Sequence, residues 1–262
     1  MRKIILSIAA SDPSGGAGIE ADLKVFTRIG VFGLTAITGI TVQEPEEIKA
    51  IIPTPIEHFR AILEIHFKKL KPDAVKIGAI ATKEHLEEIK SFLEKMRVPA
   101  VLDTILLSST GFELLEKSAW GKIKELFSLV SLITPNIEEA EILSGTKIQN
   151  NDDKVRALKI LNEQGAKAIL LKGGHLKGEP EDWLWLDGSV RLKFSRPRVA
   201  GKIHGTGCAL SSAIASYLAL GYELELAVKK AEEYLDRALY GLMEISQVKY
   251  FTHLEKEDNN GD

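Results

Sequence analysis

The sequence is short of cysteine, of long apolar runs and of charge of one sign. Cys208 is the only cysteine among 262 residues, so no internal disulfide can form and a reducing compartment, the cytoplasm, is expected. No apolar run reaches the roughly 18 residues that a membrane helix needs, which argues against a membrane protein. The net charge of −3 comes without a basic segment, so nucleic acid is not an expected partner.

Signals of several other architectures are also missing. Asp12 and Pro13 interrupt the apolar N-terminal stretch early, which favours a first strand over a signal peptide. No phosphate-binding loop of the form Gly, four residues, Gly-Lys and then Ser or Thr occurs. No Pro/Ser-rich linker, repeat or low-complexity block divides the chain. We therefore expect residues 1–262 to form one domain, with a polar and frayed tail from about residue 250.

Short β-branched runs alternate with longer amphipathic segments along most of the chain. The expected strands are Ile4–Ala9, Leu34–Thr41, Ala74–Ile77, Ala100–Asp103, Leu129–Ile133 and Ala168–Leu171. The expected helices are Glu57–Leu70, Lys83–Met96, Phe112–Leu126, Lys154–Gln164 and, later, about Gly207–Ala219 and Leu224–Glu244. Asp187-Gly188 predicts a hairpin between Trp183–Leu186 and Val190–Phe194. This alternation predicts an α/β fold with a central, mostly parallel sheet flanked by helices on both faces, and ligands beyond the carboxyl ends of its strands.

A glycine-rich loop, Ser11–Gly18, follows the first expected strand and precedes a helix. Its glycines permit a sharp turn and a close approach of the backbone to a ligand. The spacing Gly16-x-Gly18-x-x-Ala21 imitates a dinucleotide-binding fingerprint, but the turn is longer and more polar and no clear acidic residue ends the second strand. A structural turn and a loop for some other ligand both stay open.

A second glycine-containing segment, Gly205-Thr206-Gly207-Cys208, opens a helix of small residues. Free backbone N–H groups and the positive end of the helix dipole would converge there, which is typical of a phosphate or oxyanion site. In the first turn of a helix the pKa of the Cys208 thiol is expected to be lowered. The alternative is a tight turn with a buried cysteine that acts as a small hydrophobe.

Polar residues also follow the central strands. Lys172 precedes Gly173-Gly174-His175 and could place its ammonium against phosphates, although a surface lysine before a loop is the alternative, and an isolated histidine more often packs than catalyses. Asp103 closes one strand, and Asn136 and Glu139 open the helix after Pro135; together they could hold Mg²⁺ with several waters. Helix capping by Asn136 and Glu139 is the alternative.

In their order along the chain, these motifs resemble those of the hydroxymethylpyrimidine/phosphomethylpyrimidine kinases of thiamine biosynthesis, a branch of the ribokinase-like superfamily. The stretches that carry the resemblance are SDPSGGAGIEADLK, KIGAI, VLDTILLSSTG, SLITPNIEEAEIL, LKGGH, DWLWLDG and HGTGCALSSAIA. HGTGC is the most specific, because most ribokinase-like sugar kinases carry aspartate where Cys208 stands. The resemblance implies a ribokinase-like fold, usually a homodimer, that uses ATP and Mg²⁺. It implies two transfers, first to 4-amino-5-hydroxymethyl-2-methylpyrimidine and then to its monophosphate.

The resemblance also implies roles on the substrate side of the site. Gln43, which closes the second expected strand, would recognise the pyrimidine, since an amide can pair with a ring nitrogen and an exocyclic amine. Three residues of the first loop and its helix match the family's pattern beside the substrate: Asp12, Gly16 and Asp22.

The catalytic and nucleotide side follows from the same resemblance. The segment Gly205, Thr206, Gly207 and Cys208 would form an anion hole, with Cys208 in place of the superfamily's aspartate base. Lys172, Asn136 and Glu139 would bind ATP. Asp103 and Glu139 would organise Mg²⁺ and its waters.

Some positions depart from the family's pattern. Ala79 stands where many members have methionine, Ile203 replaces the usual threonine before His204, and Glu44-Pro45 follow Gln43 where Asn-Thr is common. These departures leave a pyridoxal or pyridoxine kinase on the same fold as the nearest alternative. A sugar kinase fits Cys208 less well. A non-catalytic nucleotide or precursor sensor and a dinucleotide-dependent oxidoreductase are the alternatives from other classes.

Overall fold

The computed structural model of the chain describes residues 2–44, 47–108, 110–173, 180–197 and 201–253. The elements of the first half are β1 (Ile4–Ser11), α1 (Gly18–Ile29), β2 (Phe32–Gln43), β3 (Ile48–Pro53), α2 (Ile56–Ile65) with a π-helical turn at His66–Leu70, β4 (Ala74–Ile77), α3 (Lys83–Met96), β5 (Ala100–Leu102) and a 3₁₀ segment, η2 (Lys117–Leu129). The second half holds β6 (Leu132–Ile133), α4 (Ile137–Ser144), α5 (Asn151–Glu163), β7 (Ala168–Leu171), β8 (Glu181–Leu186), β9 (Ser189–Ser195), β10 (Lys202–His204), α6 (Thr206–Ala219), α7 (Leu224–Ala238), β11 (Leu242–Ile245) and β12 (Val248–Phe251).

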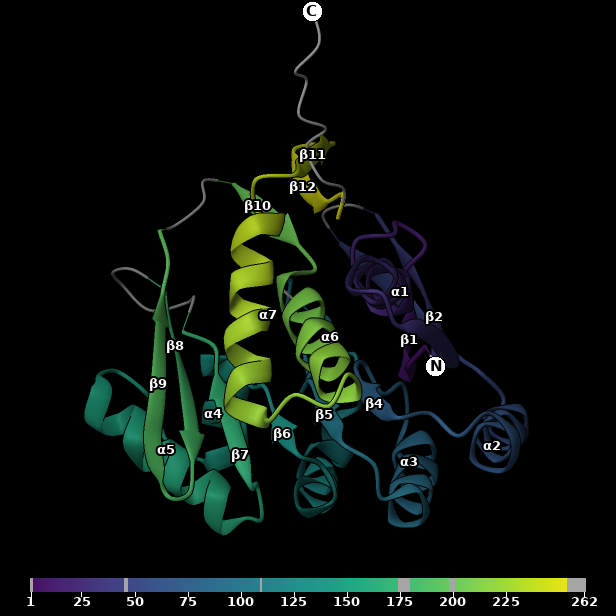
Figure 1. The fold of residues 1–262 in the computed structure, drawn as a ribbon, viewed down its shortest axis with the longest axis horizontal. Coiled ribbons are helices and arrows are strands. Elements are labelled where there is room, and N and C mark those ends of the chain that lie inside the picture. Colours follow the sequence, from purple (N-terminus) through teal and green to yellow (C-terminus); the bar gives the residue numbers. More distant parts are fainter. Residues whose placement is uncertain (1, 45–46, 109, 174–179, 198–200, 254–262) are drawn as a thin grey trace, which may run out of the picture.

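One large sheet forms the centre of the molecule (Figure 1). Its strand order is β3-β2-β1-β4-β5-β6-β7-β8-β9, and the strands from β2 to β7 are parallel. The outer strands β3, β8 and β9 run antiparallel to their neighbours. Because β2 and β4 lie on opposite sides of β1, the order reverses at β1, and its carboxyl end lies at the switch point where such sheets bind ligands. The prediction of an α/β fold with a mostly parallel sheet is confirmed.

Helices cover both faces of this sheet because its inner strands are apolar on both sides. Leu6, Ile8 and the α2, α3, η2, α4 and α5 helices share one apolar cluster. Ile5 belongs to the other cluster, with α1, α6 and α7. Successive residues of β1 thus point to opposite faces, as the strand period of two requires. In the described part of the chain, no helix is long and apolar enough to cross a bilayer.

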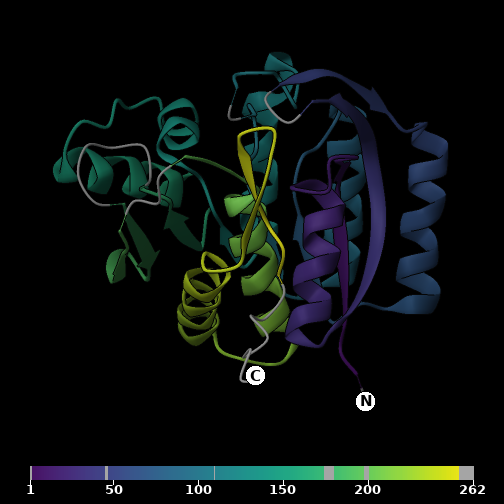
Figure 2. The same cartoon turned by 90° about the horizontal axis from the view of Figure 1, so that it is seen from above.

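A small second sheet, of order β10-β12-β11, lies over the end of α6 (Figure 2). β12 pairs in parallel with β10 and antiparallel with β11. Two predictions are wrong here. The last helix was expected to continue to Glu244, but α7 ends at Ala238 and Leu242–Ile245 is a strand. A frayed tail was expected from about residue 250, but Tyr250 and Phe251 are buried in β12; residues 254–262 lie outside the described part.

Most of the other expected elements are present at nearly the expected positions. The Asp187-Gly188 hairpin is confirmed, and both residues have positive φ, 53° and 75°. Phe112–Leu126 is not one α-helix, since the helical part is 3₁₀ and begins only at Lys117. The expected strand Leu129–Ile133 shortens to Leu132–Ile133 because Leu129 ends that 3₁₀ segment, and the edge strand β3 was not predicted.

Candidate active site

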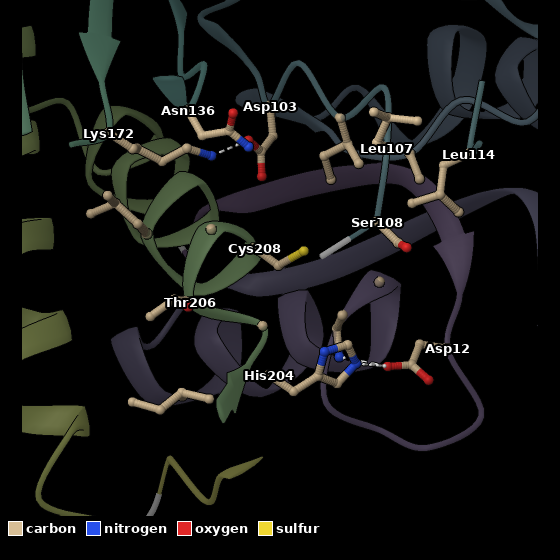
Figure 3. A pocket seen from close by; sticks show the side chains of 18 of the residues that line it. Asp12, Asp103, Leu107, Ser108, Leu114, Asn136, Lys172, His204, Thr206 and Cys208 are labelled. Carbon is tan, nitrogen blue, oxygen red and sulfur yellow. Dashed lines mark hydrogen bonds and ion pairs between the residues drawn. The ribbon is translucent and has the colours of Figure 1, made fainter. Parts of the chain in front are cut away.

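One cavity of about 550 Å³ lies beyond the carboxyl ends of the parallel strands. Its wall brings together Asp12 after β1, Asp103 after β5, Lys172 after β7 and Cys208 of α6 (Figure 3). The residues of the sequence-predicted site that line it are Asp12, Gln43, Asp103, Asn136, Glu139, Lys172, Gly205, Thr206, Gly207 and Cys208. Gly16 and Asp22 do not. Gly174 and His175, which follow Lys172 and Gly173, lie outside the described residues.

Asp12 organises the first loop. Its carboxylate accepts the backbone N–H groups of Ser14, at 2.9 Å, and Ala17, at 2.8 Å. His204 Nε2 lies 2.9 Å from Asp12 Oδ2, and because a carboxylate only accepts, this nitrogen carries the hydrogen. Burial would raise the pKa of Asp12, but the hydrogen bonds from His204 and Ser14 lower it below its usual value. An ionised Asp12 therefore ties the loop to the end of β10.

Gln43 ends β2, as the sequence predicted, and its amide is held in one orientation. Its Oε1 accepts from Thr41 Oγ1 at 3.0 Å, and its Nε2 donates to Ser14 Oγ at 3.2 Å. His204 Nε2 is also 3.3 Å from Gln43 Nε2, but this histidine nitrogen already donates to Asp12, so this contact is not a hydrogen bond. A fixed amide at the cavity wall suits recognition of a ring that carries both a donor and an acceptor.

Gly16 lies behind the residues that line the cavity and does not line it itself. The expectation that it contacts substrate is therefore corrected. A Cβ on Gly16 would lie 2.6 Å from two ring carbons of Tyr250 and would run into the ring of His204. A Cβ on Gly205, whose φ is 85°, would run into the carbonyl oxygen of Gly16. Only glycine at both positions lets the first loop pack against β10 and β12.

Asp22 also does not meet the expectation of direct substrate contact. It is fully buried, and its carboxylate accepts from Ser7 Oγ at 2.5 Å and from Ser212 Oγ at 2.6 Å. Lys76 Nζ lies 2.9 Å from each of its oxygens. These partners occupy both carboxylate oxygens of Asp22 below the floor of the cavity. Asp22 can therefore influence a bound ligand only through these partners.

The amino end of α6 faces the cavity. Gly205 adopts a left-handed conformation at the cap, and no side chain caps the helix. The first N–H groups of a helix have no partner within it, and here they belong to the cavity-lining residues Thr206, Gly207 and Cys208. This end therefore has the geometry of an anion hole.

The Cys208 thiol behaves differently from the sequence-based expectation. Burial raises its pKa to about 11, although the nearby ammonium of Lys76 opposes this effect. The expected lowering of this pKa is therefore wrong, because desolvation of the thiolate, together with the charges of Asp22 and Asp103, outweighs the effect of Lys76. Cys208 is a thiol at neutral pH.

Lys172 and Asp103 form the central ion pair of the cavity. Lys172 Nζ lies 2.7 Å from Asp103 Oδ1, which also accepts from Thr134 Oγ1 at 3.0 Å. Ser211 Oγ of α6 donates to Asp103 Oδ2 at 3.3 Å. Burial would raise the pKa of Asp103, but the ammonium groups of Lys172 and Lys76 outweigh it and lower that pKa. Asp103 is therefore charged. It lies next to Gly207, and the absence of a side chain on Gly207 leaves room beside the carboxylate and the Lys172 ammonium.

Asn136 and Glu139 do form a capping box at α4. Asn136 Oδ1 accepts the N–H of Glu139 at 2.8 Å, and Glu139 Oε2 accepts the N–H of Asn136 at 2.9 Å. Thr104 Oγ1 donates to the same Glu139 oxygen at 3.2 Å. Burial raises the pKa of Glu139 to about 7, against the opposing effect of Lys172. Both residues also line the cavity, so capping and ligand binding are compatible.

The donor set fits a metal ion that arrives with phosphates. In the described ranges, no three histidine, cysteine or carboxylate side chains cluster to hold a metal by themselves. Mg²⁺ is commonly held by one or two carboxylates together with substrate phosphates and waters. Asp103 and Glu139 supply such a pair beside Lys172.

Sequence reasoning missed several residues that build the site. Lys76 is fully buried in β4, Ser211 supports Asp103 from α6, and the ring of Tyr250 lies edge-on to His204, with ring centroids 5.7 Å apart. For Lys76 the sequence did hold a signal, because a lysine stands inside the apolar strand Ala74–Ile77. Nothing local in the sequence marks the contact of Tyr250 with His204.

Comparisons with known proteins decide the family. Residues 12–253 match the family described as phosphomethylpyrimidine kinase. The chain belongs to this family. A hydroxymethylpyrimidine/phosphomethylpyrimidine kinase of Rhizobium meliloti is 38% identical over 91% of both chains.

Solved structures agree with this assignment. The phosphomethylpyrimidine kinase of Clostridium difficile is 38% identical, with a TM-score of 0.78 over 91% of this chain and 100% of that one. An ADP complex of Bacillus subtilis pyridoxal kinase is 29% identical, with a TM-score of 0.89 over 97% of this chain and 98% of that one. The phosphomethylpyrimidine kinase family member described here thus has the ribokinase-like fold and is an ATP-using phosphotransferase.

Proposed function

We propose that the protein transfers the γ-phosphoryl group of ATP to 4-amino-5-hydroxymethyl-2-methylpyrimidine, and then phosphorylates the monophosphate to the diphosphate, in thiamine biosynthesis. The observation that carries this proposal is a single cavity that combines an anion-binding helix end, a strand-end lysine and a fixed amide in a member of this family. Gln43 stands on the substrate side with Asp12, and Lys172 on the nucleotide side.

The nucleotide phosphates fit between Lys172 and the amino end of α6. Lys172 is charged, since Asp103 outweighs the effect of burial and raises its pKa. A Cβ on Gly207 would lie 3.1 Å from Lys172 Nζ, so the ammonium and the helix end approach the same point. Phosphoryl transfer needs mainly positioning and charge stabilisation, which this pair of groups supplies.

Mg²⁺ would be held by Asp103 and, with its waters, by Glu139, and when bound it would neutralise charge on the phosphates. Because Asp103 already pairs with Lys172, occupation of Asp103 by a cation would free the lysine for the phosphates. Asn136 keeps Glu139 in place through the capping box.

Cys208 faces the acceptor hydroxyl in this arrangement. Its pKa of about 11 means that it is a weakly ionised group before substrate binds. In a loose transition state the acceptor hydroxyl loses its proton late. A neutral thiol that hydrogen-bonds to this hydroxyl, beside a cation, is therefore sufficient, and a strong base is not needed. In the second transfer the acceptor phosphate is already an anion and needs no strong base. Cys208 therefore acts mainly in the first transfer.

Two further properties belong to this proposal. A homodimer is supported by exposed apolar side chains on one face of the β2–β3 pair, Ile40, Val42 and Ile52, each between 45% and 58% exposed. Light scattering after gel filtration tests it: a mass of one chain at micromolar concentration rejects the dimer. Cytoplasmic location is supported by the single cysteine.

A pyridoxal kinase is the second candidate, and two observations favour it. The Bacillus subtilis pyridoxal kinase structure has a higher TM-score, 0.89, than the Clostridium difficile phosphomethylpyrimidine kinase structure, 0.78. Ala79, which is small, lines the cavity beside Ala10 and leaves space near the substrate side.

A product-resolved assay separates the candidates. ATP, Mg²⁺ and hydroxymethylpyrimidine are incubated with the protein, with pyridoxal in parallel, and mono- and diphosphate products are separated by anion exchange. Diphosphate formation supports the proposal. Turnover of pyridoxal alone moves the assignment to vitamin B6 salvage. Silence with both substrates, with ATP bound, supports a sensor.

A further inference from the structure

Lys76 is an internal lysine that the proposed chemistry leaves unused. It lies in β4, at the centre of the parallel sheet, and its side chain is 0% exposed. In the described part of the chain it hydrogen-bonds only to Asp22, at 2.9 Å from each carboxylate oxygen. An ammonium has three hydrogens, so one remains on the side away from the aspartate.

The ammonium is placed beneath the reaction site. Lys76 belongs to the floor of the cavity, and Gly78 leaves its end room, since a Cβ there would lie 2.8 Å from Nζ. Ser212, which donates to Asp22, stands one helical turn after Cys208 on α6. The Asp22–Lys76 pair is thus linked directly to the helix whose amino end faces the acceptor.

Stability is a poor explanation for this pair. Two charges removed from water cost more than an apolar pair of similar volume, and replacement of buried ion pairs by neutral groups is often harmless or stabilising. Burial would lower the pKa of Lys76, but the charges of Asp22 and Asp103 and the hydrogen bonds to Asp22 raise it, so the lysine keeps its charge. The chain therefore keeps a charged lysine at a place where apolar residues of similar volume could serve the fold as well.

We propose that Lys76 is a positioning residue for phosphoryl transfer, whose fixed ammonium, oriented by Asp22, stabilises the negative charge that develops at the amino end of α6. In the first transfer the acceptor oxygen bonds to the γ-phosphorus, the bond to the ADP oxygen breaks, and the hydroxyl proton passes to an oxygen of the transferred phosphoryl group or to water. Negative charge near the helix end rises as this happens, and the cation beneath it needs no rearrangement to respond. The inference rests on the proposed function.

The decisive variant removes both charges together. Lys76→Met with Asp22→Asn leaves no unpaired charge. The Ser7 and Ser212 hydroxyls bond to different oxygens of Asp22, so the asparagine offers its oxygen to one hydroxyl and its NH2 to the other, which can turn to accept it. We expect its melting temperature to stay within a few degrees of the wild type, while kcat of the first transfer falls at least tenfold and the KM for ATP changes less than threefold. The matched control is the exposed pair Lys90–Glu125, as Lys90→Met with Glu125→Gln, which should keep wild-type kcat.

Alkylation of Cys208 supplies a readout that does not depend on turnover. Cys208 is the only cysteine, so uptake of iodoacetamide by the chain reports this thiol alone. Because Lys76 and Asp22 act on Cys208 with opposite signs, Lys76→Met should slow alkylation at pH 8.5 and Asp22→Asn should speed it, each at least twofold. A purely structural disturbance would move both variants in the same direction.

The outcomes distinguish failure of the proposed function from failure of the role proposed for Lys76. A wild type that turns over no pyrimidine overturns the proposed function, and opposite alkylation shifts would still support the placement of the cation. Wild-type kcat in the stable double variant overturns the inference and leaves the proposed function intact. If either single variant unfolds, the kcat of the double variant, compared with that of its control, decides whether Lys76 has the proposed role.

Discussion

The strand β12 makes a direct contact with the candidate site, and Tyr250→Ala tests what this contact does. Tyr250 is 4% exposed, its ring lies edge-on to His204, and it closes the space above Gly16. His204 in turn donates to Asp12, which holds the N–H groups of the first loop. Removal of the ring leaves His204 without its neighbour on that side.

The expected size follows from these contacts. Loss of a buried aromatic ring costs about 3–5 kcal/mol in a core, and the lower end applies to a ring that packs in a three-stranded sheet. For a chain of this length, about 3 kcal/mol corresponds to a fall in melting temperature of roughly 6–10 °C. A weakened hydrogen bond between His204 and Asp12 of about 1.4 kcal/mol would raise the KM for the pyrimidine about tenfold.

The assay combines calorimetry with steady-state kinetics below the lowered melting temperature. KM for the pyrimidine should rise about tenfold while KM for ATP changes less than twofold, because Lys172 and α4 are untouched. Tyr250→Phe keeps the ring and should behave like the wild type. Tyr240→Ala, which removes the same side chain at a position 79% exposed, controls for general effects near the small sheet. Equal rises in both KM values, or an unchanged pyrimidine KM in a destabilised protein, would refute the reasoning.

Three further predictions concern the cavity. Cys208→Ala should lower the rate of the first transfer by more than a hundredfold and that of the second by less than tenfold, measured from the separated products in single-turnover experiments. Equal losses in the two transfers would contradict a role of the thiol at the acceptor hydroxyl. Lys172→Met should raise KM for ATP at least tenfold with an unchanged circular dichroism spectrum, and an unchanged KM would place the phosphates elsewhere. Since the pKa of Cys208 is raised in the folded state, to about 11 from an ordinary 9.0, its contribution to stability is complete below pH 9 and is lost as the pH rises towards 11. The wild type should therefore lose about 2 kcal/mol relative to Cys208→Ala between pH 9 and pH 11 in urea unfolding, and parallel pH curves would contradict the burial of the thiol.

Much of the site could be predicted because its residues sit where local patterns put them. Strand runs locate their own carboxyl ends, so Gln43, Asp103 and Lys172 could be placed at one edge of a parallel sheet before the structure was known. The Asp187-Gly188 turn and the Asn136 cap are short-range features with their own sequence signals.

The rest depends on contacts between distant segments. Asp22 meets Lys76 across 54 residues, so a carboxylate that looks like part of the first loop belongs to a buried pair. The thiol of Cys208 stands at a helix end, which lowers a pKa, but its burial depends on tertiary packing and has the larger effect. β12 pairs in parallel with β10, 46 residues away in register, and no turn or alternation within Val248–Phe251 announces it.

The position of β12 has a consequence for the order in which the protein is assembled during synthesis. β12 is the last described strand in the sequence, yet it lies between β10 and β11. A nascent chain can close the large sheet and place Lys172 and Asp103 before it has any partner for β10. His204 gains its neighbour only once Val248–Phe251 has left the ribosome, so the substrate side of the pocket is completed last.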